Sequence, residues 1–279
     1  MAKLNKSSIL LPHKILPPHA IILLASGLSE RLGQPKQLLK KKSQSLLEIM
    51  VNISLATQPQ FIAVVVPSSS QQILQLIQTL SVKHPTIEPV INRQPKLGMG
   101  HSLSLAIDKL NSKVEQGVLI ERVLILGIDQ IMLDTSHLLN LLTDKTSTAG
   151  EAIDQSNNNK LVIASGYLKT YIDNINAYAE SYLPYNAEDN AKDNVKDNVK
   201  DNVKDDKQFD KNDVVGLPIN LDYKLLKQWQ SSLMGDKGLR YLIRGLPTSK
   251  LDVIYNAKLS LDIDTIDELA FARDKGWLD

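Results

Sequence analysis

Short aliphatic runs alternate with amphipathic stretches along much of the chain. The runs have the length and bulk of strands buried on both faces, and they comprise Ala20–Leu24, Phe61–Val66, Thr86–Ile91 and Arg122–Ile128. Apolar residues recur at helical spacing between them, which predicts helices at Ser45–Ala56, Ser69–Leu80, Ser102–Leu110 and Ser136–Leu142. This alternation predicts an α/β fold with a doubly wound, mostly parallel sheet of the Rossmann-like type.

A low-complexity segment interrupts the pattern. Residues 191–206 repeat a tetrapeptide in tandem, AKDNVKDNVKDNVKDD, and the flanks are almost as polar. A few valines among Asp and Asn cannot offset the entropy of ordering. We therefore expect a disordered surface insertion at about 186–213, with a partner-binding segment as the alternative. After it, the pattern predicts two strands, Val214–Ile219 and Leu251–Tyr255. It also predicts three helices: one that follows the first of these strands and ends at Trp229, one at Asp236–Arg244 and one at Ile266–Lys275.

The composition is that of a single large domain. The chain has 279 residues, of which 43% are hydrophobic, enough for a sizeable core. We expect residues 1–19 to form a flexible N-terminal tail, because prolines follow its aliphatic run, Ile9–Leu11. That run is too short for a signal-peptide core or a membrane span. We expect residues 20–279 to form the folded domain, interrupted by the insertion at about 186–213. We also expect the protein to be cytoplasmic.

Charge and cysteine content exclude several functional classes. The 32 basic and 31 acidic residues leave a net charge of +1, so neither a nucleic-acid nor a membrane-surface partner is expected. The chain has no cysteine. Disulfides, thiolate nucleophiles and cysteine-ligated metal sites are therefore excluded.

The first aliphatic run opens into a small-residue loop that carries two cations. Gly27 and Gly33 allow the backbone to approach an anion closely, and Arg31 and Lys36 can offset several negative charges. The loop is neither a Walker motif nor a Gly-x-Gly-x-x-Gly turn. On spacing alone, it is either a phosphate-binding loop or an ordinary strand-to-helix connection.

Two further loops are expected at the same edge of the sheet. Asn92–His101 and Asp129–Leu133 each follow a predicted strand, and ligands of such sheets bind beyond the carboxyl ends of the strands. Asp129 is placed to hold Mg²⁺ through one oxygen while water and phosphates complete the coordination. The alternative is a helix N-cap, for which Asp134 is the better candidate.

The loop also resembles a known signature. Leu24-Ala25-Ser26-Gly27-Leu28-Ser29-Glu30-Arg31-Leu32-Gly33-Gln34-Pro35-Lys36-Gln37-Leu38 is similar to the nucleotide-binding motif of MobA-like nucleotidyltransferases, L-A-A/G-G-x-S-x-R-M/L-G-x-x-K-x-L. Ser26 is the one departure at a fixed position. The resemblance implies that the nucleotide is bound by Leu24, Ala25, Ser26, Gly27, Arg31 and Lys36.

Two other segments extend the resemblance toward the nucleotide and the metal. Asn92–Leu103 resembles the family loop that approaches the base and the phosphates, which implies roles for Asn92, Gly98 and Ser102. The segment 260–269 resembles the family's Asp-Ile-Asp-Thr-Pro-Glu-Asp-Leu element, with isoleucine in place of proline, and Asp129-Gln130-Ile131 lacks the usual proline too. Alternation in Leu261–Ile263 predicts a short strand with Asp262 and Asp264 on one face. Either aspartate is a candidate for the second metal ligand, and the alternative is that Asp264 or Thr265 caps the last helix. We interpret Asp262 as the metal ligand and Asp264 as a cap.

The acceptor side is expected in the C-terminal third. Gly216-Leu217-Pro218-Ile219 resembles the family's Gly-x-Pro strand, and residues 235–240 resemble its Gly-Asp-x-Gly-x-Arg element. The resemblance implies that the acceptor contacts Gly216, Pro218, Gly235, Asp236 and Arg240.

The resemblance implies a nucleotidyltransferase that depends on Mg²⁺ or alternatively Mn²⁺, with Arg31, Lys36 and Asp129 in catalysis. It is greatest to the molybdenum-cofactor cytidylyltransferases, since Ser26 occupies space as alanine would. This implies CTP and molybdenum cofactor as substrates, with a molybdoenzyme as a possible recipient of the product. The alternatives are guanylyl transfer, a sugar- or alditol-phosphate acceptor, and a non-catalytic protein that delivers cofactor to a molybdoenzyme.

Overall fold

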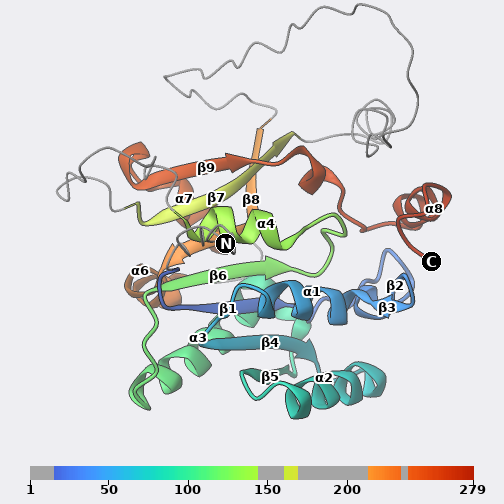
Figure 1. Ribbon diagram of the computed structural model, residues 1–279, viewed down its shortest axis with the longest axis horizontal. Helices are drawn as coiled ribbons and strands as arrows, with labels where there is room; N and C mark the ends of the chain where they lie inside the picture. The colour runs from blue at the N-terminus through green and yellow to red at the C-terminus, as the bar shows by residue number, and fades with distance from the viewer. Residues whose placement is uncertain (1–15, 144–159, 169–212, 234–237) are drawn as a thin grey trace, which may run out of the picture.

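The computed structural model describes residues 16–143, 160–168, 213–233 and 238–279. Its core is a seven-stranded sheet in the order β5-β4-β1-β6-β8-β7-β9 (Figure 1). The strands are β1 (His19–Leu24), β4 (Phe61–Pro67), β5 (Ile87–Asn92), β6 (Arg122–Gly127), β7 (Val162–Leu168), β8 (Asp213–Asp222) and β9 (Leu251–Tyr255). A separate hairpin pairs β2 (Lys40–Lys41) with β3 (Gln44–Ser45). The tetrapeptide repeat lies outside the described residues.

The sheet is mostly parallel, as predicted. β5, β4, β1 and β6 are parallel neighbours, and β7 is parallel to β9, whereas β8 runs antiparallel to both β6 and β7. The register pairs Leu24 with both Val65 and Gly127. The loops that follow these central strands therefore begin at one common edge.

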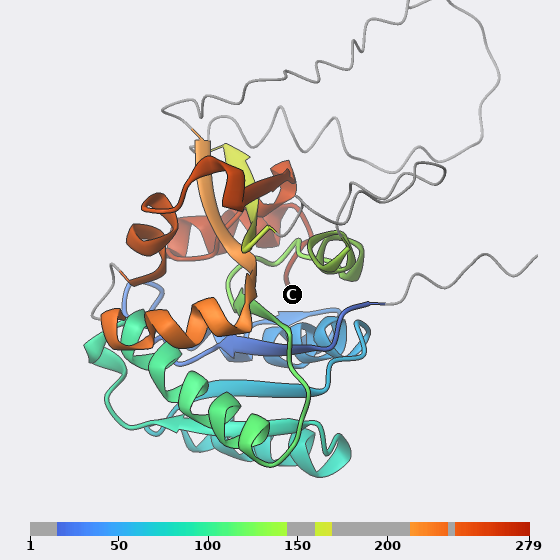
Figure 2. The ribbon, with the colours of Figure 1, turned by 90° about the vertical axis from the view of Figure 1, so that its left-hand side faces the viewer.

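Helices cover both faces of the sheet (Figures 1 and 2). Alternate β1 residues contribute to two cores: Ile21 and Leu23 pack with α1, α2, α4 and α8, and Ala20 and Ile22 pack with α3, α6 and α7. The helices are α1 (Leu46–Leu55), α2 (Gln71–Lys83), α3 (Met99–Glu115), α4 (Thr135–Leu142), α6 (Tyr223–Trp229), α7 (Gly238–Arg244) and α8 (Ile266–Asp274). Short 3-10 turns are η1 (Lys36–Leu38), η2 (Pro95–Leu97), η3 (Gln230–Ser232), η4 (Thr248–Lys250) and η5 (Ala257–Ser260). Among the described residues, no helix is both long and apolar enough to cross a membrane.

Several element boundaries differ from the sequence-based predictions, three of them at the start of β1 or beside the cleft. His19, assigned to the N-terminal tail, is the buried first residue of β1 and pairs with Arg122. Helix α3 begins at Met99 rather than Ser102, because the positive φ of Gly98 (88°) lets the chain turn directly into the helix. The expected strand at 261–263 is reduced to a single bridge between Gln130 and Asp262.

Candidate active site

The loops after β1, β5 and β6 converge at the carboxyl edge of the sheet, as predicted, and line a cleft of about 1200 Å³. We call its two sides the β1 half and the β8 half. The β1 half comprises residues 24–36 and 95–102, and the β8 half comprises Tyr167, residues 215–219 and residues 239–244. Asp129, Asp262 and Asp264 line the cleft between the halves.

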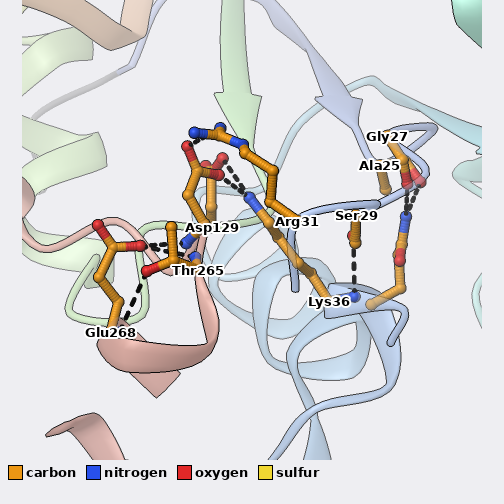
Figure 3. A network of polar contacts seen from close by, with 10 residues as sticks. Ala25, Gly27, Ser29, Arg31, Lys36, Asp129, Thr265 and Glu268 are labelled. Carbon is orange, nitrogen blue, oxygen red and sulfur yellow. Dashed lines mark hydrogen bonds and ion pairs between the residues drawn. The ribbon is translucent and has the colours of Figure 1, made fainter. Parts of the chain in front are cut away.

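A buried glutamine fixes the backbone of the β1 loop. Gln37 is fully buried, and its Nε2 donates hydrogen bonds to Ala25 O (2.6 Å) and Gly27 O (3.0 Å). Ser29 Oγ, in turn, accepts a bond from Lys36 N (3.2 Å), as Figure 3 shows. The carbonyl oxygen of Ser29 accepts from Gly33 N (3.1 Å). These hydrogen bonds support the backbone of the loop at several points. Gln37 stands at a variable position of the signature, so the resemblance implied no role for it.

A buried polar cluster joins the β1 loop to the start of α3. The hydroxyl groups of Ser26 and Ser102 share a hydrogen bond of 2.7 Å, and Asn92 Nδ2 donates to Ser102 Oγ (3.0 Å). All three side chains are buried. Ser26, Gly98 and Ser102 line the cleft. Asn92 is fully buried and contacts the cleft-lining residues through its bond to Ser102. The predicted nucleotide-binding residues of β5 and α3 thus meet those of β1.

Lys36 lies at the centre of an ion-pair network (Figure 3). Its Nζ bonds to Asp264 Oδ1 and lies 3.4 Å from Asp129 Oδ2, and Arg31 Nη2 donates to Asp264 Oδ2 at 2.7 Å. Burial lowers the pKa of Lys36, but Asp129 and Asp264 outweigh that effect and leave the pKa raised. Burial likewise raises the pKa of Asp264, and the bonds from Lys36 and Arg31 outweigh it, so the net shift is downward. Both groups are therefore charged at neutral pH.

The position of Asp264 corrects the sequence-based interpretation. The N-cap of α8 is Thr265, whose hydroxyl accepts from Glu268 N while the Glu268 carboxylate accepts from Thr265 N. This capping box provides hydrogen-bond partners for backbone N–H groups at the start of the helix. The Asp264 side chain is therefore not needed as a cap and faces Arg31 and Lys36. The cap predicted at Asp134 is present on α4, and Asp129 is not used as a cap.

Asp129 and Asp262 offer oxygens suited to a divalent cation. Asp262 Oδ1 is buried without a hydrogen-bond partner, and burial, with the charges of Asp129 and Asp264, raises the pKa of Asp262 to about 8. A buried carboxylate oxygen without a partner is unfavourable unless a cation compensates it. Within the described residues, no three His, Asp or Glu side chains are grouped as a metal site. Two carboxylates suffice for Mg²⁺, which takes its other ligands from water and phosphates.

A glycine makes room for one of these carboxylates. A Cβ atom at position 127 would lie 2.7 Å from Asp129 Oδ1. Gly127 ends β6, so the Asp129 side chain can fold back over the end of the strand. This is a steric requirement that the sequence pattern alone does not reveal.

The family assignment comes from the sequence as a whole. Residues 21–251 match the MobA-like NTP transferase domain, which is most of the chain. The chain belongs to the MobA-like NTP transferase family. The protein is accordingly a nucleotidyltransferase, and transferases of this type use a nucleoside triphosphate and a divalent metal.

Solved structures resemble the transferase in fold at low sequence identity. Rv0371c from Mycobacterium tuberculosis H37Rv is 14% identical, with a TM-score of 0.57 over 92% of this chain and 98% of that chain. A 4-diphosphocytidyl-2C-methyl-D-erythritol synthase from Anaerococcus prevotii DSM 20548 is 15% identical, with a TM-score of 0.56 over 93% and 96%. A Methanothermobacter nucleotidyl transferase, Mth528, is 13% identical, with a TM-score of 0.55 over 93% and 97%. No curated protein matches the chain in sequence.

The β8 half of the transferase brings together residues that are distant in sequence. Gly216 and Arg240 line the cleft as expected, whereas Gly235 and Asp236 lie outside the described residues. Pro218 supports the lining, since its carbonyl oxygen accepts from Ser165 Oγ (2.6 Å). Gln130, next to Asp129, donates to Leu217 O (2.8 Å) and so ties the β6 loop to β8.

Tyr167 is a residue of this half that the sequence analysis missed. Burial raises the pKa of its hydroxyl, as do Asp262 and Asp129, while Arg240 acts in the opposite direction. The hydroxyl thus lies within electrostatic reach of both carboxylates and of Arg240. A Cβ atom at position 216 would lie 2.6 Å from that oxygen, so Gly216 provides the room for it. The sequence offered no signal, because β7 itself was not predicted.

Proposed function

We propose that the transferase moves CMP from CTP to the phosphate of a molybdopterin-type molybdenum cofactor and releases pyrophosphate. One observation carries the proposal: Lys36 and Arg31, from the loop after β1, share one cleft with Asp129, Asp262 and Asp264. Cations beside a carboxylate pair suit a reaction between two anionic groups, in which charge neutralisation and alignment dominate catalysis.

The β1 half is the proposed triphosphate site. Lys36 and Arg31 would bind the phosphates and stabilise the charge that develops on the α-phosphate and the departing pyrophosphate. Gln37 holds the carbonyl groups of Ala25 and Gly27, and the loop amides of this segment would cradle the phosphates. Leu24, Ser26, Gly98 and Ser102 line the same half and would enclose the nucleoside.

Asp129 and Asp262 are the proposed ligands of Mg²⁺, with Mn²⁺ as a possible substitute. The ion would supply Lewis-acid neutralisation of the reacting phosphates. Asp129 is partly exposed, with a side-chain exposure of 35%, whereas Asp262 Oδ1 is buried. Asp129 would therefore present its carboxylate to the substrate side, and Asp262 would anchor the site from within the protein.

The β8 half is the proposed acceptor site. Gly216 and Arg240 line it, and Pro218 shapes the β8 strand beside it; Gly235 and Asp236 are proposed on the strength of the family resemblance. An oxygen of the acceptor phosphate attacks the α-phosphorus of CTP, and the bond between the α-phosphorus and the α,β-bridging oxygen breaks. Pyrophosphate leaves with that oxygen. Because the attacking phosphate oxygen is already ionised, a protein base is not required.

The preference for cytosine rests on Ser26. Its hydroxyl is engaged by Ser102, so the side chain fills space at the end of β1 rather than pairing with a base. The Ser26 side chain therefore narrows the space beside the end of β1 where the base would lie. Cytosine, a smaller ring than guanine, tolerates the narrower space better. The name of one structure similar in fold, 4-diphosphocytidyl-2C-methyl-D-erythritol synthase, contains a cytidyl group, which is consistent with the proposal.

The test is pyrophosphate release with four nucleoside triphosphates and three acceptors. CTP with molybdenum cofactor should give the fastest release, ahead of GTP, ATP or UTP and ahead of a sugar or alditol phosphate. Ser26→Gly should shift the preference toward GTP, whereas Ser26→Ala, which keeps the Cβ atom, should retain it. Faster release with GTP would contradict the cytidylyl assignment, and binding without release would favour a cofactor-delivery protein.

A further inference from the structure

The two cations of the β1 loop are paired with carboxylates of the same cleft. Asp264 bonds to both Arg31 and Lys36, and Lys36 also faces Asp129 (Figure 3). The partners are 233 and 228 residues apart in sequence. The segment before α8 therefore presents a carboxylate where the proposed function places the phosphates of a nucleotide.

The backbone holds this carboxylate in place. Asp264 N donates to Glu268 Oε2 at 2.7 Å, and the same oxygen accepts from Thr265 N at 2.8 Å. The bridge between Gln130 and Asp262 anchors the preceding residues to the β6 loop. Asp264 is thus attached to the beginning of a capped helix, and its side chain keeps a third of its surface exposed to the cleft.

The ion-pair network contains as many carboxylates as cations. Arg31 and Lys36 are its cations, and Asp264 and Asp129 are the carboxylates with which they pair. A triphosphate without metal therefore gains little net attraction, and it must compete with Asp264 for the same N–H donors. A carboxylate that accepts charge-assisted bonds from Arg and Lys is a close chemical stand-in for a phosphate.

We propose that Asp264 is an internal counter-ion that makes triphosphate binding by this site depend on a divalent cation. A bound cation adds positive charge beside Asp129 and Asp262, so a metal-loaded site attracts the phosphates even with Asp264 in place. Without the cation, Asp264 opposes binding. This inference rests on the proposed triphosphate site, and it does not depend on the identity of the base or the acceptor.

Calorimetric titration with inorganic tripolyphosphate tests the inference, in EDTA and in Mg²⁺. The unaltered full-length protein should bind much more tightly in Mg²⁺. Asp264→Asn should bind at least about fivefold more tightly than the unaltered protein in EDTA, because one opposing charge and one competitor are removed. The ratio of the affinities in Mg²⁺ and EDTA should fall accordingly.

Three further variants separate charge from fold and from general electrostatics. Asp264→Glu keeps the charge and should keep the metal dependence, and Asp264→Ser, a second neutral variant, should behave as Asp264→Asn does. Asp267→Asn removes a charge from the exposed first turn of α8 and should change the EDTA affinity by less than about twofold. Melting temperatures establish that each variant is folded.

Equal or weaker binding of Asp264→Asn in EDTA would overturn the inference, as would an equal gain in Asp267→Asn or a lack of tripolyphosphate binding even in Mg²⁺. The proposed function fails separately. If Asp264→Asn gains affinity as expected while CTP and molybdenum cofactor yield no pyrophosphate, the counter-ion role stands and the proposed reaction does not.

Discussion

The two halves of the cleft are built in different ways. The β1 half comes mainly from one continuous segment, and its shape is fixed by the buried side chains of Gln37, Ser26 and Ser102. The β8 half combines Tyr167, Gly216 and Arg240 from three separate elements, and Tyr241 of α7 is 75% exposed. The difference indicates that the proposed phosphate-binding half depends mainly on one loop and its buried supports, whereas the proposed acceptor half depends on packing between separate elements and on exposed side chains.

The largest effect is expected where the halves meet, at Asp129. Asp129→Asn keeps the size of the side chain and removes its charge, so the rate should fall by about a thousandfold or more, with both substrates still bound. The melting temperature should change little, because the side chain is partly exposed. Asp134→Asn, which can still cap α4, serves as the control. A near-normal rate of Asp129→Asn at saturating Mg²⁺ would remove Asp129 from the metal site.

Lys36→Ala tests the β1 half alone. Loss of this cation should remove roughly 2–4 kcal/mol of transition-state stabilisation. The value of kcat/KM should fall accordingly, with little change in the KM for the acceptor. Lys40→Ala, an exposed lysine four residues away, should retain activity. Unchanged turnover in Lys36→Ala would contradict the phosphate-site assignment.

Gly216→Ala tests the β8 half alone. The added Cβ atom would lie 2.6 Å from the Tyr167 hydroxyl, so the strand or the ring must shift, and the acceptor KM should rise about tenfold. Tyr167→Phe removes the clashing oxygen, and the Cβ atom is then 3.4 Å from the nearest ring carbon. The double variant should therefore behave like Tyr167→Phe, a non-additive result. A rise in the CTP KM instead would show that the halves are not separable.

Gln37→Met probes how the β1 half is preorganised. The change removes the two bonds to Ala25 O and Gly27 O while keeping the volume, so stability should fall by about 1–3 kcal/mol and the CTP KM should rise a few-fold. Gln34→Met, at an exposed position of the same loop, should have neither effect. Full CTP affinity in Gln37→Met would show that the loop holds its shape without this side chain.

His19, near the start of β1, should affect stability and neither half of the cleft. Burial lowers its pKa below the ordinary 6.5, despite a bond to Pro17 O that acts in the opposite direction. The folded state therefore disfavours the protonated ring, and the free energy of unfolding should fall as the pH drops below 6.5. His19→Gln should weaken this dependence in chemical denaturation at pH 5 to 8, with pyrophosphate release at pH 7.5 unchanged. If the variant shows the same dependence of stability on pH, His19 is not the group responsible for it.

Local patterns predicted the fold and many residues that line the β1 half, whose role in binding stays a prediction; packing determined the rest. The aliphatic runs identified most strands, but β7 contains Ser165 and Gly166 within a short run and was missed. The pairing of Asp264 with Arg31 depends on how α8 docks against the sheet, which no motif encodes. Gln37 and Tyr167 are residue types with no special signal in a sequence. The role of Gln37 comes from the carbonyl groups of Ala25 and Gly27 that it contacts, and that of Tyr167 from the room that Gly216 leaves for its hydroxyl.

The central claim is that the cleft transfers the nucleotidyl group itself. The most direct measurement incubates the protein with Mg²⁺, molybdenum cofactor and CTP labelled with ³²P at either the α- or the γ-phosphate. The account predicts that the α label appears in the cofactor product and the γ label in pyrophosphate. Transfer of the γ label to the cofactor, or its release as inorganic phosphate, would contradict the account.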